Sequence, residues 1–388
     1  MQIVEINTYL LKAPTEKAFY SSQGLFTGRK SLIVEIKTDT GLVGWGEGGQ
    51  YGPAEPTRAC IESVFAPQLI GSDPLTPPLH WERLYSTIRD FGTSGPYIEA
   101  LSALDIAMWD IAGKHYGTSI ANLIGGARRK AIYAYGTGFY YPADAAFKVD
   151  EGQIRDECAR KLETGFGMMK VKIGLLSIAE DARRLKIVRD TVGDDIQLLV
   201  DCNHSYNFAS ARKMAEVLDD YGVLWFEEPV IPEDKDAYRK LRDVSPVPIA
   251  GGEAEYTRHG FKQLILGGCV DIAQPDVCVA GGISEWMRIQ ALASVAGVSV
   301  IPHIWGSGIA LAAALQVLAA TPANPFTANP IPLLNEPVLE FDTTDNPLRT
   351  ELLVQPFGLQ EGFVQLPEAP GLGISIDEGA LRKYSVTS

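Results

Sequence analysis

The sequence MKVKI at residues 169–173 is followed at regular intervals by LLVD (198–201), LWFEE (224–228), PIAGGE (248–253), DIAQPD (271–276) and VSVIPH (298–303). Each run is short, apolar and β-prone, and each carries a charged or ionisable residue at or near its end. From Lys172 onward these residues are 29, 26, 26, 23 and 27 positions apart. Amphipathic helices are predicted between the runs, for example after the capping box of Ser177 and Glu180. Such alternation predicts βαβ units and a parallel sheet.

Two further runs, Ile132–Gly136 and Val338–Phe341, flank this series. Seven or eight units favour a closed, TIM-type (β/α) barrel over an open sheet. No glycine-rich phosphate motif follows the first strand, which argues against a dinucleotide-binding fold. The predicted class is therefore α/β, with a barrel as the main domain.

The N-terminal region has a different pattern. Apolar runs around Asp39-Thr40-Gly41 predict a hairpin, and Tyr20–Thr27 is predicted to be a loop. Leu101, Leu104, Met108 and Ile111 share one helical face, with Asp105 and Asp110 expected on the polar face. Strands followed by helices indicate an α+β capping domain, which the C-terminal tail is expected to complete. The predicted boundaries are 1–128 for the capping domain, 129–355 for the barrel and 356–388 for the tail.

Composition narrows the functional classes. The net charge of −14 disfavours nucleic acid and anionic membranes as partners. No apolar stretch is long enough to span a bilayer, and the N-terminus has no signal-peptide pattern. The five cysteines follow no zinc-binding spacing, and at this chain length they favour a reducing compartment over a disulfide scaffold. We therefore expect a cytoplasmic protein.

The strand ends carry the chemistry. In a parallel barrel the carboxyl ends of the strands meet at one mouth, so their charged residues should gather there. Asp201, Glu227 and Glu253 would bring three carboxylates together, which is costly unless a cation binds them. An all-oxygen ligand set favours Mg²⁺ over zinc. A purely structural ring of charges is the alternative for any one of these residues.

Two more groups accompany the carboxylates. Lys170 and Lys172 point the same way from one strand, so each is expected to lower the pKa of the other. Asp276 and His303 come from neighbouring strands and can form a pair in which the carboxylate orients the imidazole. A lysine base, a metal and a histidine together fit removal of a proton α to a carboxylate, with the metal stabilising the enediolate.

These residues resemble the mandelate racemase subgroup of the enolase superfamily. The matching motifs are Lys170-Val171-Lys172, Asp201, Glu227-Glu228-Pro229, Gly251-Gly252-Glu253, Gln274-Pro275-Asp276, Pro302-His303, Trp109–Lys114 and Gly371-Leu372-Gly373. The resemblance implies Mg²⁺ on Asp201, Glu227 and Glu253. It also implies Lys172 and the His303–Asp276 pair as the two acid/bases, with Lys170 tuning Lys172.

Further implications of the resemblance concern the substrate. Glu340 is the best match to a Glu that hydrogen-bonds the substrate carboxylate, and the segments 20–27 and 46–53 would close over the substrate. A homo-oligomer is also implied. The segments 201–206, 226–230 and 302–308 are most similar to acid-sugar cycloisomerases and dehydratases of this family. Asn203, His204, Tyr20 and Trp305 are accordingly predicted to bind substrate, although a backbone-bonded His204 and a core Trp305 are alternatives.

Three functions remain open from the sequence. The first is proton abstraction from a sugar-derived acid or lactone followed by β-elimination, as in dehydration or the opening of a galactarolactone ring. The second is racemisation or epimerisation of a 2-hydroxy acid by the same two bases. The third is a barrel that binds a metal or ligand without catalysis, although plain binding does not require a matched lysine and histidine.

Overall fold

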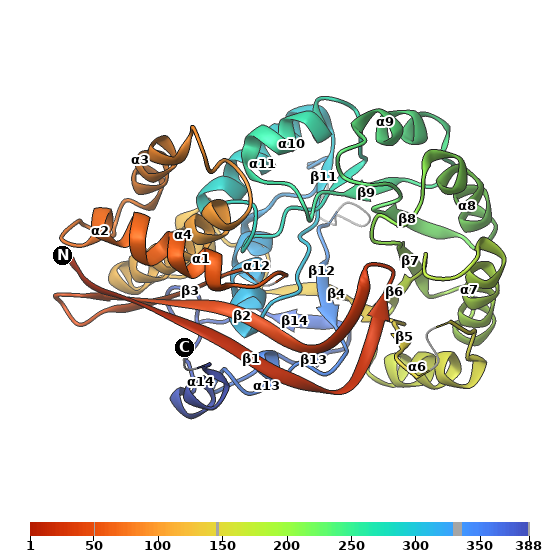
Figure 1. Cartoon of the computed structure of the whole chain (residues 1–388), viewed down its shortest axis with the longest axis horizontal. Helices are drawn as coiled ribbons and strands as arrows, with labels where there is room; N and C mark the ends of the chain where they lie inside the picture. The colour runs from red at the N-terminus through yellow and green to blue at the C-terminus, as the bar shows by residue number, and fades with distance from the viewer. Residues whose placement is uncertain (50, 145–146, 329–335, 387–388) are drawn as a thin grey trace.

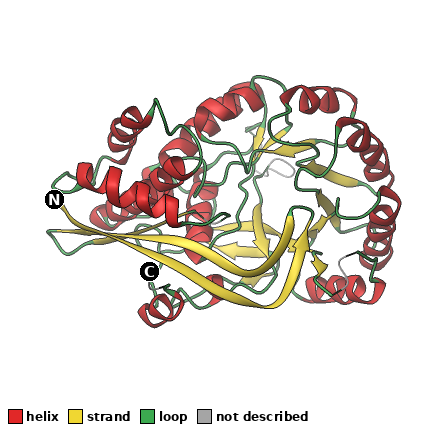
Figure 2. Ribbon diagram, in the orientation of Figure 1, coloured by secondary structure: helices red, strands yellow, loops and turns green. Residues whose placement is uncertain are grey.

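A computed structural model describes residues 1–49, 51–144, 147–328 and 336–386 of the chain. An antiparallel sheet with its helices lies beside a larger barrel of strands ringed by helices (Figures 1 and 2). The predicted combination of an α+β capping domain and a (β/α) barrel is therefore confirmed.

A long hairpin dominates the capping sheet, in which β1 (Ile3–Ser21), β2 (Gly24–Thr38) and β3 (Val43–Gly48) are antiparallel. The turn of the hairpin reaches the barrel, where the Ser22 hydroxyl donates to the backbone carbonyl of Cys202 at 2.5 Å. The prediction of a loop over Tyr20–Thr27 is wrong, because pairing continues to Ser21 and Gly24 at the turn. Phe19 and Phe26 stack across the two strands with ring centroids 5.5 Å apart. Cross-strand aromatic contacts of this kind stabilise extended pairing.

The capping helices are α1 (Glu55–Cys60), the π-helix η1 (Ile61–Phe65), α2 (Ala66–Leu69), α3 (Pro77–Ile88), α4 (Pro96–Tyr116) and α5 (Ile120–Leu123). The apolar face predicted for α4 is buried, but its expected polar face is buried as well. Asp105 accepts hydrogen bonds from the backbone N–H (2.8 Å) and hydroxyl (2.5 Å) of Ser284 in the barrel. Asp110 accepts from the backbone N–H groups of Trp45 (3.0 Å) and Leu372 (2.8 Å). These aspartates therefore join α4 to its neighbours rather than facing water.

The barrel strands are β4 (Ala131–Gly138), β6 (Met168–Lys172), β7 (Gln197–Asp201), β8 (Val223–Glu227), β9 (Ile249–Gly251), β10 (Ile272–Ala273), β11 (Ser299–Val300) and β12 (Leu339–Asp342). They are parallel and follow the order β12-β4-β6-β7-β8-β9-β10-β11. Each coincides with a run predicted from the sequence.

The helices that follow these strands in turn are α6 (Glu151–Glu163), α7 (Ile178–Val192), α8 (Phe208–Asp220), α9 (Lys235–Val244), α10 (Thr257–Ile265), α11 (Gly282–Ala296), α12 (Gly308–Ala320) and α13 (Pro347–Thr350). The predicted capping box of Ser177 and Glu180 starts α7. Asn207 caps α8, because its side chain accepts a hydrogen bond from the backbone N–H of Ser210.

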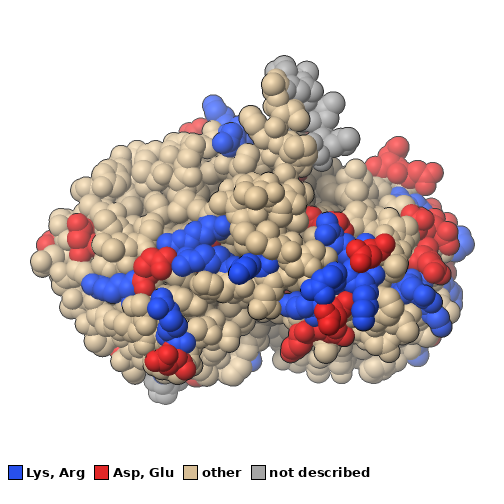
Figure 3. Space-filling model, turned by 90° about the horizontal axis from the view of Figure 1, so that it is seen from above, with Lys and Arg blue, Asp and Glu red and all other residues tan. Residues whose placement is uncertain are grey.

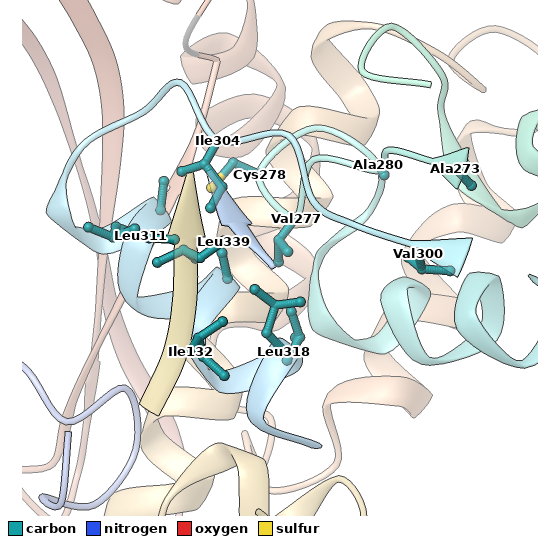
Figure 4. Packing of buried hydrophobic residues seen from close by; sticks show 14 of the residues in the cluster. Ile132, Ala273, Val277, Cys278, Ala280, Val300, Ile304, Leu311, Leu318 and Leu339 are labelled. Atoms are coloured by element: carbon teal, nitrogen blue, oxygen red, sulfur yellow. The ribbon is translucent and has the colours of Figure 1, made fainter. Parts of the chain in front are cut away.

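The barrel core continues from the strands into α12. Leu339 of β12 and Ile132 of β4 pack near Leu311 and Leu318 of α12 (Figure 4). All residues of α12 except the last are buried. Packing of this density fixes the loop that precedes α12, which carries His303.

The C-terminal tail touches both domains. It contains β13 (Leu359–Gln360), β14 (Phe363–Gln365) and α14 (Glu378–Tyr384). Strand β14 pairs with β4 of the barrel, while the backbone N–H of Val386 donates to Leu10 of β1 at 2.8 Å. A two-residue strand, β5 (Tyr141–Pro142), also pairs with β1. The domain boundaries at 128/129 and 355/356 stay predictions.

The surface seen in Figure 3 carries Lys and Arg side chains beside Asp and Glu. Ion pairs such as Arg242–Asp271 (2.8 Å) join neighbouring elements, and exposed pairs of this kind add little stability.

All five cysteines are free and buried, which agrees with the expectation that the chain has no disulfide scaffold. Within the described ranges, every helix is too short or too polar to cross a membrane.

Candidate active site

The charged residues at the strand ends converge, as the sequence predicts. Lys170 and Lys172 lie on β6, while Asp201 and Glu227 end β7 and β8. The remaining three follow shortly after β9, β10 and β11, in the order Glu253, Asp276 and His303. All seven side chains are buried, with 0–6% of each residue exposed. Six strands therefore deliver ionisable groups to one buried region.

Asp201, Glu227 and Glu253 form a group whose candidate ligand atoms all lie within 4.8 Å of one another. Glu227 accepts hydrogen bonds from the Gln274 amide (2.8 Å) and the Trp225 indole (3.1 Å). The Oε2 atom of Glu253 is buried and accepts no hydrogen bond. Burial and neighbouring negative charges raise the pKa values of Glu227 and Glu253. A hard cation would satisfy this oxygen-only set, so the residues fit a divalent metal.

A second group shares Glu253 and adds His204 and Glu228. Here His204 Nε2 lies 2.5 Å from Glu228 Oε2. Burial alone would lower the pKa of the imidazole, but the Glu228 carboxylate outweighs it and raises the pKa of His204 to about 9. The Glu228 carboxylate therefore favours the charged form of His204.

The lysines are held by the same carboxylates. Lys170 Nζ lies 2.7 Å from both Glu227 and Glu340, and Lys172 Nζ contacts Asp201 and donates to Asn203 Oδ1 at 3.0 Å. The expected opposition between the two ammonium groups is present at Lys172, but it does not set the direction of the pKa shift. Burial and the neighbouring ammonium do oppose the charge on Lys172, but the carboxylates, Asp201 foremost, outweigh both and raise its pKa. The negative charges that raise this pKa belong largely to the candidate metal ligands.

The predicted Asp276–His303 pair is present. His303 Nδ1 lies 2.8 Å from Asp276 Oδ2, and His303 Nε2 lies 3.5 Å from Glu253. The other oxygen of Asp276 accepts the backbone N–H of Cys278 at 2.8 Å, which fixes the carboxylate. Burial opposes the imidazolium, yet Glu253, Asp276 and Glu340 overcome it and raise the pKa of His303 to about 10.

Glu340 lies on β12, the eighth strand of the barrel, where the resemblance places it. Its Oε1 accepts from Thr137 (2.6 Å) and lies 2.7 Å from Lys170, while Oε2 accepts from the backbone N–H of Ile304 (3.0 Å). Although burial opposes ionisation, Lys170 and His303 lower the pKa of this carboxyl. Glu340 thus connects Lys170 with the His303 loop, and its contact with substrate stays a prediction.

Lys172 and His303 line one small cavity of about 20 Å³. Its other lining residues are Ser21, Gln23, Phe26, Tyr51, Tyr140, Asn203, Glu253 and Trp305. The Tyr51 hydroxyl lies 2.7 Å from His303 Nδ1. Tyr51, Gln23 and Phe26 come from the segments that the resemblance expects to cover the substrate. Gln50 in one of those segments and residues 329–335 of the Pro- and Asn-rich segment before β12 lie outside the described residues.

The four predicted substrate-binding residues separate into two groups. Asn203 and Trp305 line the cavity, whereas Tyr20 and His204 do not. Tyr20 lies on the other face of β1 from Ser21, with its ring 6.0 Å from that of Phe147. His204 pairs with Glu228 through Nε2, and Gln23 Nε2 of the hairpin turn lies 3.4 Å from His204 Nδ1. Tyr140, which follows β4, also lines the cavity and was not predicted from the sequence.

A capping domain on a (β/α) barrel with this order of lysine, carboxylate and histidine residues defines an enzyme of the enolase superfamily. The chain belongs to the mandelate racemase/muconate lactonizing enzyme family. Residues 5–125 match the N-terminal domain of that family, and residues 153–380 match the Enolase C-terminal domain-like family. The chain is accordingly grouped with the isomerases and lyases of the superfamily.

The chain is similar to proteins of this family that are named as cycloisomerases and dehydratases. The chain is 42% identical to D-galactarolactone cycloisomerase of Agrobacterium fabrum, over 99% of each chain. Its structure matches the 3,6-anhydro-D-galactonate cycloisomerase of Zobellia galactanivorans with a TM-score of 0.88 and 35% identity, over 100% of both chains. An L-talarate/galactarate dehydratase variant with bound Mg and L-glucarate matches with a TM-score of 0.86 and 27% identity, covering 100% of this chain and 92% of the other.

Proposed function

We propose that the protein removes the proton α to the carboxylate of a sugar-derived acid or its lactone, in a Mg²⁺-dependent reaction, and then expels a β-oxygen. The observation that carries the proposal is that Lys172 and His303 line the same cavity, beside the Asp201–Glu227–Glu253 group. Two groups that can move protons therefore meet where a carboxylate could be held.

Asp201, Glu227 and Glu253 would hold Mg²⁺, which when bound supplies positive charge to stabilise the charge that develops on the substrate carboxylate. Lys172 and His303 are the two acid/bases. Asn203 positions Lys172 by accepting its hydrogen bond at 3.0 Å. Asp276 fixes the orientation of His303 and stabilises its charged form. Lys170 and Glu340 form a buried ion pair, through which Lys170 also contacts Glu227 of the candidate metal ligands.

The electron balance is that of a β-elimination. One of the two bases takes the α-proton, and the C–H electrons form the new C=C bond as the β-carbon–oxygen bond breaks. In an acyclic acid sugar the leaving oxygen takes a proton and departs as water. In a lactone whose ring oxygen is on the β-carbon, that oxygen leaves as a carboxylate and the ring opens. The enol product then becomes a keto acid.

Lactone ring opening is favoured over simple dehydration. The protein is similar along almost its whole length to a D-galactarolactone cycloisomerase, and a second cycloisomerase is among the solved structures that match its fold. Racemisation or epimerisation uses the same Lys172 and His303 and remains the second candidate, because both residues lie at the cavity.

A substrate screen tests the proposal. The Mg²⁺-loaded protein is incubated with aldonic acids, aldaric acids and their lactones in D₂O, and the products are followed by NMR. A keto acid supports elimination, and unconsumed or inverted substrate carrying deuterium at the α-carbon supports the racemase alternative. If no compound of the panel is turned over or exchanges its α-proton, both elimination and racemisation are contradicted. The result would then favour a barrel that binds a metal or ligand without catalysis.

We further propose that the protein is a cytoplasmic homo-oligomer whose partner is a small-molecule carboxylate rather than nucleic acid or membrane. The strong negative charge of the chain supports the partner class. Light scattering coupled to size-exclusion chromatography measures the oligomeric state, and a monomeric mass would contradict that part of the proposal.

A further inference from the structure

A larger groove adjoins the catalytic cavity. Its volume is about 410 Å³, and it shares Phe26, Tyr51 and Trp305 with the cavity that holds Lys172 and His303. The groove is otherwise lined by residues 12–14 of β1 and by Leu25 and residues 27–30 of β2. The inner cavity of about 20 Å³ is roughly the space of one water molecule. The cavity must therefore widen to admit a sugar acid, and the three residues that it shares with the groove form their common wall.

The groove is basic in a protein that is strongly acidic overall. Lys12 and Lys30 both line it, and they occupy directly opposite positions on the antiparallel strands β1 and β2. Like charges in opposite register destabilise a sheet unless something offsets them. Arg29, also in the lining, is already neutralised by Asp342 at 2.8 Å and stacks 4.2 Å from the centroid of Trp305.

The two lysines are only partly neutralised by the protein. Lys12 lies 3.3 Å from Glu55, and the two side chains are 46% and 49% exposed, so water weakens this pair. Lys30 forms no ion pair with any described residue. The groove therefore presents positive charge, although the chain as a whole has a net charge of −14.

The wall between the groove and the cavity includes a contact with a catalytic candidate. The Tyr51 hydroxyl reaches 2.7 Å from His303 Nδ1, and the Tyr51 ring also borders the groove. Phe26 and Trp305 form the rest of the shared wall, with ring centroids 5.5 Å apart. The three residues that line both the groove and the cavity with His303 are thus all aromatic.

We propose that this groove is the entrance to the active site and that Lys12 and Lys30 form a capture site for a carboxylate group of the substrate. The inference rests on the proposed function for the identity of the anion, because a sugar acid is the carboxylate that this site would receive. Opposite charge in a concave entrance concentrates an anion and raises its association rate.

Isothermal titration calorimetry with the full-length Mg²⁺-loaded protein tests this capture site. The probes are D-galactarate, which carries two carboxylates, and galactitol, the uncharged polyol of the same carbon skeleton. The variants are Lys30→Gln and the double variant Lys12→Gln/Lys30→Gln. The matched control is Lys186→Gln, which removes an exposed lysine from α7, where Lys186 pairs with Asp190.

We expect galactarate affinity to fall at least about fivefold in Lys30→Gln and further in the double variant, with galactitol binding unchanged. We also expect the galactarate affinity of the protein that keeps Lys12 and Lys30 to weaken with added salt more steeply than that of the double variant. Galactarate affinity equal in Lys30→Gln, the double variant and Lys186→Gln would overturn the proposal. All proteins in the titration also carry Lys172→Ala, which prevents turnover of galactarate, so failure of the catalytic proposal would be seen separately, in the substrate screen.

Discussion

Replacing Asp276 by Asn keeps the size of the side chain and an oxygen that can accept from His303 Nδ1, but removes the negative charge. In the wild-type protein the two groups are 2.8 Å apart and both are buried. The negative charge of Asp276 is one of the causes that raise the pKa of His303 to about 10. The variant therefore isolates the electrostatic part of this contact.

The expected size follows from the hydrogen bond. A bond to a charged group contributes about 1.5–3 kcal/mol, and a neutral one about 0.5–1.5 kcal/mol, so the substitution removes about 1–2 kcal/mol from the imidazolium form. Since one pKa unit corresponds to about 1.4 kcal/mol, the pKa of His303 should fall by about one unit. The direction is downward because the charged form loses its stabilising partner.

NMR of protein labelled with ¹⁵N-histidine measures this shift without any need for turnover. His303→Asn assigns the signal, and Asp190→Asn on the surface of α7 serves as the control. An imidazole that titrates at the same pH in wild type and Asp276→Asn would refute the argument. The limb of the pH–rate profile that belongs to His303 should move to lower pH by the same amount, with a fall in kcat of about tenfold or more.

Three other substitutions test separate parts of the structure. Glu227→Gln should weaken Mg²⁺ binding at least about tenfold while Glu228→Gln weakens it less, because Glu227 belongs to the all-carboxylate group; calorimetry showing the reverse order would place the metal at His204 and Glu228. Asp105→Asn tests the contact of α4 with Ser284 of the barrel. Burial raises the pKa of Asp105 to about 7, so the folded state binds the extra proton and wild-type stability should fall as pH rises from about 4 to 7. The variant should lose a pH-dependent decline of up to about 4 kcal/mol, and denaturant unfolding curves with the same pH dependence in both proteins would contradict this. Gly113→Ala should lower stability by about 1–3 kcal/mol, because a Cβ at Gly113 would lie 2.5 Å from the Cα of Gly371; an unchanged Tm would show that the tail can move away.

The barrel and its charged mouth could be predicted because their signals are local. Each βα unit repeats a short apolar run and an amphipathic helix, and each run leads to its own charged residue. Asp201, for example, directly follows the buried run 198–200. Once parallel strands are inferred, their carboxyl ends must share one mouth, and the group of Asp201, Glu227 and Glu253 follows.

Contacts between distant parts of the chain could not be predicted from the sequence. Asp105 and Asp110 look like surface residues of α4 because a helical pattern assumes one solvent-facing side. Their partners Ser284 and Leu372 come from the barrel and the tail, 179 and 262 residues away. The sequence alone does not show that both sides of a helix will be covered.

Long-range contacts in the candidate active site could not be predicted from the sequence either. The two lysines were expected to lower each other's pKa, yet each also meets a carboxylate from another strand, and those contacts prevail. Tyr51 reaches His303 from a capping segment about 250 residues earlier in the chain. No spacing rule connects these two residues, and only the resemblance to a family pointed to the segment as a whole.

The central claim is that Lys172 and His303 move protons at one shared cavity. The most direct test compares wild type, Lys172→Ala and His303→Asn in D₂O, with the acid sugar or lactone that the screen identifies, by ¹H NMR of the α-position. We predict that each variant loses turnover by at least about a thousandfold, and that α-proton exchange survives in at most one of them, since a single residue removes that proton. Wild-type turnover in either variant, or wild-type exchange in both, would contradict the claim.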